Sequence, residues 1–130
     1  VVAEASAEHC VIKIPLNWRT KNHLGSMYLG VLTVGADLAG GYLAMRLIRL
    51  RRQKVSIVFK SLKAEYHKRV EGAALFSCHD GVAIARALEQ TLATGDRVTL
   101  PVRVKTIVPE RFAEESVADF ELLLSVKRVT

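Results

Sequence analysis

One carboxylate interrupts a long apolar stretch of the sequence. Asp37 is the only charged residue between Met27 and Met45. A carboxylate on an apolar helix is costly to bury unless it is paired or hydrogen-bonded, and burial raises its pKa toward that of a useful base. Because acids perturbed in this way cluster at functional sites, we take Asp37 as the first candidate for chemistry. The alternative is a structural acid that bonds to the backbone or to an arginine such as Arg46.

Three reactive residue types adjoin in the run Cys78, His79 and Asp80. Adjacent residues of a strand point to opposite faces, so this order indicates a buried cysteine followed by a turn cap rather than a triad. The four histidines have no metal-ligand spacing such as His-x-x-x-His, and the sequence has no glycine-rich phosphate loop. We expect no bound metal and no cofactor, and we expect Cys10 and Cys78 to be buried and reduced.

Basic residues follow the apolar stretch at Arg49, Arg51, Arg52 and Lys54. One interpretation is a solvated cap that complements the dipole of a helix, and the other is a seat for phosphate groups. The net charge of +6 and the pI near 9.6 bias the surface toward anions. Three Tyr, four Phe and one Trp leave little for base stacking, so we expect no nucleic-acid partner.

The stretch from Met27 to Arg52 is predicted to form a helix with Ser26 as its N-cap. Its apolar residues are too widely spread for one amphipathic stripe, which is typical of a helix buried in a core or in a membrane. The run from Met27 to Met45 is near the lower limit of about 20 residues for a membrane span. Asp37 lies at the middle of that run, however, and the neighbouring strands have apolar faces that need a cover. We therefore expect a dry core helix and no membrane span.

Period-two alternation predicts strands before and after this helix, at residues 10–14, 55–60, 70–78, 98–105 and 118–127. A short helix is predicted over 84–92, with Asp80 as its cap and Gly95 as its end. Residues 3–8 should be a loose or weakly helical lead-in, and 109–116 a connecting loop. Strands with one apolar face are typical of antiparallel sheets. At 130 residues the chain suits one α+β domain, residues 1–130, in which an antiparallel sheet wraps around a long central helix.

This order of elements resembles the hot-dog fold, and the turn into the helix resembles that of the phenylacetyl-CoA-type thioesterases. That family carries Asn-x-x-Gly-x-x-His-Gly-Gly, followed by Asp seven residues after the second glycine of the closing pair. The matching positions here are Asn22, Gly25, Gly30 and Asp37. Tyr28 replaces the histidine and Leu29 the first glycine of that pair, and Val55-Ser56-Ile57 is similar to the strand opening at which the family places a serine. With the extra helix near 84–92, these departures point to an uncharacterised branch of the superfamily.

The resemblance implies a thioesterase that hydrolyses acyl-CoA or another acyl thioester without a serine triad. Backbone N–H groups at the start of the helix, near Gly30, stabilise the oxyanion. Asp37, reached across a dimer interface, activates water or attacks the carbonyl. Ser56 of the partner subunit holds the water, and Asn22 fixes the loop. The residues expected to contact the substrate are Tyr28, Leu29 and Gly25 of the motif, His23 in the motif loop, and Lys60, which adds to the basic residues.

The same resemblance implies a homodimer or homotetramer. The opening Val1-Val2-Ala3-Glu4 lacks the pattern of a signal peptide, so we expect a cytoplasmic protein. Two departures from the family's motif leave open an alternative to thioester hydrolysis. Leu29 narrows the expected pocket, and Tyr28 is larger than histidine and neutral near pH 7. Both substitutions favour a non-catalytic hot-dog module that binds acyl-CoA or a lipid-like ligand.

Overall fold

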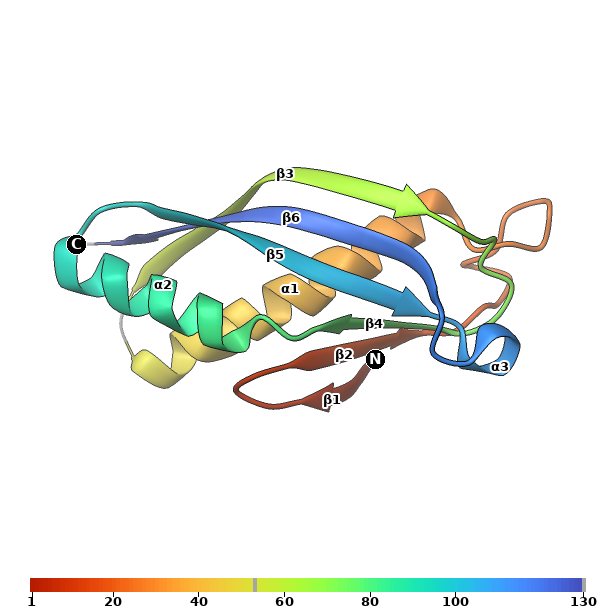
Figure 1. The fold of residues 1–130 in the computed structure, drawn as a ribbon, viewed down its shortest axis with the longest axis horizontal. Helices are drawn as coiled ribbons and strands as arrows, with labels where there is room; N and C mark the ends of the chain where they lie inside the picture. The colour runs from red at the N-terminus through yellow and green to blue at the C-terminus, as the bar shows by residue number, and fades with distance from the viewer. Residues whose placement is uncertain (53, 130) are drawn as a thin grey trace.

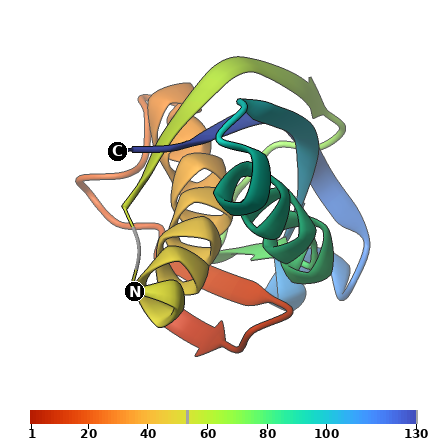
Figure 2. The same ribbon diagram turned by 90° about the vertical axis from the view of Figure 1, so that its left-hand side faces the viewer.

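Six strands form one antiparallel sheet that curves around two helices (Figure 1 and Figure 2). The strand order across the sheet is β1-β2-β4-β5-β6-β3. The computed structural model describes residues 1–52 and 54–129. In chain order the elements are β1 (Val2–Ala5), β2 (Cys10–Ile14), α1 (Leu29–Arg51), β3 (Val55–Tyr66), β4 (Ala74–Cys78), α2 (Gly81–Thr94), β5 (Val98–Ile107), α3 (Pro109–Phe112) and β6 (Ser116–Arg128).

α1 is the long helix predicted from the apolar stretch, and it begins at Leu29, later than predicted. Its N-cap residue, Tyr28, makes no capping hydrogen bond through its side chain to any described residue. The predicted cap, Ser26, is buried, and its hydroxyl accepts a hydrogen bond from Nε of Arg69 at 2.9 Å. The N-cap prediction is therefore wrong, because the Ser26 hydroxyl fastens the preceding loop to the segment after β3.

Only one face of α1 is buried against the sheet. The buried residues of this face are Leu32, Gly35, Ala36, Ala39, Gly40, Leu43, Ala44, Leu47 and Ile48. The opposite face carries Val34, Leu38, Tyr42 and Met45, which are all exposed. The expectation of a helix that is dry on all sides is therefore wrong, because the sheet of one chain covers a single side of α1. By length and composition α1 could also cross a membrane, but half of its most apolar window is buried inside this domain.

α2 lies beside α1 on the inner side of the sheet (Figure 2) and confirms the predicted extra helix. Its buried face includes Ile84 and Leu88, and Gly95 ends the helix in the left-handed conformation, with φ of 78°, as predicted. Asp80 stands at the N-cap position, but its side chain does not cap the helix. The Asp80 carboxylate instead accepts a hydrogen bond from the backbone N–H of Arg103 at 2.7 Å, which ties the start of α2 to β5.

β3 continues beyond the predicted segment 55–60 and reaches Tyr66. Its pairing with β6 shifts register between Phe59 and Ser61, so Lys60 is the extra residue of a β-bulge. One extra residue reverses the alternation of side chains between the two faces of a strand. As a result, Phe59 packs against the core before the bulge and Ala64 packs against it afterwards.

Three smaller predictions differ from the structure. The expected lead-in contains strand β1, which pairs with β2 at one edge of the sheet. The expected loop 109–116 contains the short helix α3. The expected strand 70–78 is shorter, since only Ala74–Cys78 pairs as β4. β3 forms the other edge of the sheet, opposite β1. The outer face of α1 lies beside this edge, and the two elements line a hollow between them.

Candidate active site

The turn that leads into α1 is shaped by Asn22. Its Oδ1 accepts hydrogen bonds from the backbone N–H groups of Leu24 at 2.9 Å and Ser26 at 3.1 Å. Gly25 completes the turn with φ of 77°, a conformation that glycine adopts at no steric cost. His23 is exposed in the same turn. Asn22 and Gly25, the first two positions of the motif, thus fix the path of the chain into the helix.

The first turn of α1 is open to its surroundings. Tyr28 and Leu29 are exposed, and 61% of Leu29 is accessible to solvent. A Cβ added to Gly30 would meet no described atom within 4 Å outside its chain neighbours and the nearby backbone of α1. The first N–H groups of a helix lack intrahelical acceptors, and the helix dipole favours negative charge near them. This end of α1 therefore offers both space and hydrogen-bond donors to an oxygen atom that develops negative charge.

Asp37 lies on the outer face of α1 and is exposed, so the expectation of a buried acid is wrong for the single chain. It lines two neighbouring hollows between α1 and β3, and the larger has a volume of about 420 Å³. That volume lies in the range of small-molecule sites. Arg46, the predicted alternative partner of this acid, donates a hydrogen bond to the carbonyl of Ser6 at 3.3 Å. Asp37 is thus a carboxylate shared by two adjoining hollows.

The bulge of β3 lines the smaller hollow. Lys60 and Ser61 face the same space as Asp37. Bulges re-aim side chains and are frequent beside active sites. Ser61 was not among the predicted site residues, because no sequence pattern reveals the bulge. The predicted serine, Ser56, is exposed and is not among the lining residues of either hollow, so its assignment to the site of the partner subunit stays a prediction.

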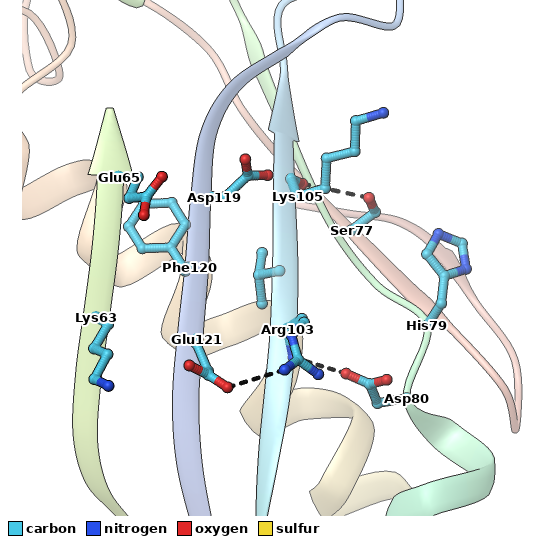
Figure 3. A pocket seen from close by; sticks show the side chains of 11 residues that line it. Lys63, Glu65, Ser77, His79, Asp80, Arg103, Lys105, Asp119, Phe120 and Glu121 are labelled. Atoms are coloured by element: carbon cyan, nitrogen blue, oxygen red, sulfur yellow. Dashed lines mark hydrogen bonds and ion pairs between the residues drawn. The ribbon is translucent and has the colours of Figure 1, made fainter. Parts of the chain in front are cut away.

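A further hollow, of about 480 Å³, lies on the outer side of the sheet (Figure 3). Its charged lining residues come mainly from β3, β5 and β6, and one ion pair joins two of them. Nη2 of Arg103 donates to Oε1 of Glu121 at 3.1 Å, and Lys63 stands opposite Glu121 in the register of β3 and β6. Exposed pairs of this kind contribute little free energy and are typical of the solvated face of an antiparallel sheet. The walls of this hollow are therefore mostly charged and polar, whereas those of the larger hollow beside α1 are mostly apolar.

The run Cys78, His79 and Asp80 does not form a triad. Cys78 is buried, and burial raises the pKa of its thiol to about 12. His79 is exposed, and its ring stacks on that of His9 with the centroids 5.4 Å apart. The prediction of a buried, reduced cysteine is confirmed for Cys78 and for Cys10, which faces it across β2 and β4. Within residues 1–52 and 54–129, no three His, Cys, Asp or Glu side chains are placed to hold a metal ion.

Asp119 joins β6 to the segment that follows β3. One carboxylate oxygen lies 2.8 Å from Nε2 of His67, and the other accepts a hydrogen bond from Oγ of Ser116 at 2.7 Å. Burial alone would raise the pKa of Asp119, but the hydrogen bonds from His67 and Ser116 outweigh burial and hold the pKa below its ordinary value. This acid of the outer sheet face therefore has a structural role.

Replacing Asp119 with Asn is expected to lower the free energy of unfolding at pH 7 by at most about 1 kcal/mol, because 51% of the side chain is exposed. The folded pKa lies below the unfolded value of about 3.9, so this stabilisation is present above that pH and is lost as the pH falls through the folded pKa. Urea unfolding of both proteins at pH 7 and at about pH 3 measures the effect. A difference that stays constant on acidification would contradict the role given to this carboxylate.

Proteins of known structure share this arrangement over almost the whole chain. A protein of unknown function from Chlorobaculum tepidum superposes with a TM-score of 0.81 at 14% identity, covering 98% of this chain and 82% of that chain. A probable thioesterase from Pseudomonas aeruginosa gives 0.80 at 18% identity with the same coverage. A thioesterase from Haemophilus influenzae gives 0.72 at 14% identity, covering 98% of this chain and 77% of that chain. The architecture is therefore the hot-dog fold, as the order of elements in the sequence predicted.

The model of one family, a domain of unknown function (DUF4442), matches residues 1–116. The chain belongs to this family. No curated protein matches the sequence. Because the similar structures are so distant in sequence, they define the fold, and the activity has to be argued from the site.

Proposed function

We propose that this protein hydrolyses acyl thioesters with Asp37 as the base or nucleophile. The observation that carries the proposal is the position of Asp37, which joins two hollows on the helix whose open first turn contains Gly30. Seven residues separate Gly30 from Asp37, a rise of about 10 Å along the helix axis. Two of the similar solved structures are described as a probable thioesterase and a thioesterase, which supports the same reaction class.

In the proposed reaction, the thioester carbonyl lies against the first N–H groups of α1, which stabilise the developing oxyanion. Asp37 removes a proton from water, and the resulting hydroxide attacks the carbonyl carbon. The tetrahedral intermediate then breaks the C–S bond, and the proton held by Asp37 passes to the departing thiolate. The products are a carboxylic acid and a thiol. Direct attack by the Asp37 carboxylate would form an anhydride, which water hydrolyses to the same products.

Other residues around Asp37 are given supporting roles. The ammonium of Lys60 lines the smaller hollow and would attract an anionic group of the substrate there. Ser61 supplies a hydroxyl in the same hollow and is a second candidate, besides Ser56 of the partner subunit, to hold the water. Tyr28 and Leu29, exposed at the start of α1, would contact the acyl group or its carrier.

The direct test is to incubate the protein with acyl-CoA thioesters of short, long and aromatic acyl groups and to measure release of the free thiol. We expect turnover of at least one of these thioesters. Calorimetric titration with the same compounds separates the alternative function, a non-catalytic binding module. Tight binding without thiol release across the panel would exclude hydrolysis and select the binding module, which the larger side chains of Tyr28 and Leu29 favour.

We also propose that the protein acts as a homodimer in which a second copy covers the outer face of α1. β3 is an edge strand of 12 residues, and long edge strands favour pairing with another strand. Beside it lie the exposed apolar side chains of α1, together with Val58 and Leu62 of β3. A continuous apolar surface along an unpaired edge is typical of an interface. Pairing of the two edges would enclose Asp37 between the protomers.

Replacing Leu38 with Arg is expected to dissociate this dimer, because an unpaired charge would be buried at the centre of the interface. The matched control is Leu50→Arg, a change of the same type on the same helix at an exposed position outside the apolar face. Sedimentation equilibrium measures the mass of each protein and also separates a dimer from a tetramer. A wild-type protein that is monomeric at micromolar concentration would contradict the proposal, as would a Leu38→Arg protein that stays dimeric.

A further inference from the structure

The loop between β2 and α1, residues 15–28, exposes large apolar side chains at the end of the molecule where α1 begins (Figure 1). Trp18 is 77% exposed and Leu24 is 60% exposed. Tyr28 and Leu29, where the loop joins α1, are exposed as well. Single exposed apolar side chains are common on soluble proteins, but a group of them within one short segment is typical of an interaction site.

Hydrogen bonds fold this loop back on itself and hold its shape. The backbone N–H of Tyr28 donates to the carbonyl of Thr20 at 2.9 Å, so the arm that carries Trp18 lies beside the arm that leads into α1. At the tip of the loop, Nη2 of Arg69 donates to the carbonyl of Leu24 at 3.0 Å. The exposed side chains therefore stand on a preformed protrusion, and binding through them would cost little ordering entropy.

The charged side chains of this part of the chain are all basic. No carboxylate occurs between Glu8 and Asp37, whereas Arg19 and Lys21 are exposed in the loop. Cζ of Arg19 lies 4.9 Å from the centroid of the Trp18 ring, which is a cation–π contact. A tryptophan beside a cation suits the boundary of a lipid bilayer, where indole rings lie among the headgroups and cations meet the lipid phosphates.

The acids at the same end of the molecule lie apart from the loop. The short helix α3 is separated from the loop in both views (Figure 1 and Figure 2). Glu110 of α3 accepts a hydrogen bond from the backbone N–H of Ala73 at 3.0 Å, and Glu115 pairs with Lys68 at 3.5 Å. A flat surface that approaches the tip of the loop therefore meets its apolar and basic side chains first.

A second copy of this chain is a poor partner for the loop. A stable protein interface buries about 800 Å² on each partner, and the few exposed side chains of one loop fall short of that area. Two copies of the loop facing each other would also bring Arg19 and Lys21 against the same positive charges. An anionic bilayer needs only shallow insertion of a few apolar side chains, together with electrostatic attraction.

We propose that the loop of residues 15–28 binds this protein to the surface of anionic membranes. Trp18 and Leu24 insert among the lipid headgroups. Arg19 and Lys21 bind the lipid phosphates. The protein then lies on the bilayer without spanning it, and the first turn of α1, which adjoins the loop, faces the same surface. This interaction needs no turnover, so it stands or falls separately from the proposed hydrolysis.

Trp18 is the one tryptophan in the chain, so its fluorescence reports on the loop without a label. The experiment titrates the protein with vesicles of phosphatidylcholine and with vesicles of phosphatidylcholine mixed with phosphatidylglycerol. With the anionic vesicles we expect the emission to shift to shorter wavelength, because the indole leaves water, and lipids brominated on their acyl chains should quench it. Neutral vesicles should give a much smaller shift, and added salt should weaken binding to the anionic vesicles.

Two variants with matched controls locate the contact, and cosedimentation with the anionic vesicles measures their binding. Arg19→Gln should bind about fivefold more weakly, the effect of removing one charge near an anionic surface. Its control is Arg86→Gln, the same change at an exposed position of α2. Leu24→Ser should bind about tenfold more weakly because it removes buried apolar area. Its control is Leu50→Ser, at an exposed position near the other end of α1.

An emission spectrum that stays unchanged with anionic vesicles would overturn the inference. Equal binding to neutral vesicles would do the same, as would an equal loss in each control variant, since either result removes the role of this loop and its charge. A shift to shorter wavelength that grows with protein concentration in the absence of lipid would show that a second copy covers Trp18, and it too would refute the membrane contact.

Discussion

Replacing Asp37 with Asn should lower kcat for thioester hydrolysis by about 10²–10⁴-fold, the usual contribution of a general base. The amide is close in size to the carboxylate but cannot accept a proton from water or form an anhydride. Because Asp37 is exposed on the outer face of α1, the substitution should leave the fold intact. Thiol release under saturating substrate measures the effect. Binding of coenzyme A should be retained, since the amide keeps the size of the side chain and the other walls of the hollow are unchanged.

The matched control for this prediction is Asp96→Asn, which removes the same charge from an exposed acid in the turn between α2 and β5. This control should keep the wild-type kcat. Retention of wild-type kcat by Asp37→Asn would remove the assigned mechanism. A loss shared by both variants would point to the overall charge of the protein rather than to the carboxylate in the hollow.

Replacing Gly35 with Ala should lower the free energy of unfolding by about 1–3 kcal/mol, the usual effect of overpacking a core. A Cβ at this position would overlap the ring of Phe76, which belongs to β4 and is fully buried. Because protein interiors are close-packed, displacing this ring would disturb the residues around it. Gly35 is therefore the position at which α1 approaches the sheet most closely among the glycines of the helix.

Gly41→Ala is the matched control on the same helix. A Cβ there would make an ordinary contact with the ring of Phe59. Because alanine is favoured over glycine inside a helix by about 1 kcal/mol, this variant should be as stable as the wild type or more stable. Urea unfolding of the three proteins measures both effects. A Gly35→Ala protein as stable as Gly41→Ala would contradict the close contact between α1 and β4.

The sequence was sufficient to predict the central helix, the antiparallel strands and the hot-dog fold. The helix follows from the length of the apolar run before Arg52, and the strands follow from the alternation of apolar and polar residues along β5 and β6. The second half of β3 could not be predicted in this way. The bulge at Lys60 reverses the alternation, so the apolar positions after it no longer continue the pattern that begins at Val55. For the same reason Ser61 was missed as a neighbour of Asp37.

The environment of Asp37 could not be predicted from the sequence either. The spread of apolar residues around α1 suggested burial on every side, whereas the structure buries one face and leaves Leu38 and its apolar neighbours exposed. A sequence pattern shows that a face is apolar but not whether it packs against the same chain or against another copy. Within the basic run, the pairing of Arg51 with Glu89 of α2 depends on a tertiary contact in the same way.

The central claim is that ligand binds between α1 and β3 rather than on the outer face of the sheet. The most direct test is to titrate the protein with a thioether analogue of acyl-CoA, which cannot be hydrolysed, and to follow backbone amide chemical shifts by NMR. We predict the largest changes at Gly30, Asp37, Gly41 and Lys60. Changes that cluster instead at Ser77, Lys105 and Glu121 would place the ligand in the hollow of Figure 3 and contradict the proposed site.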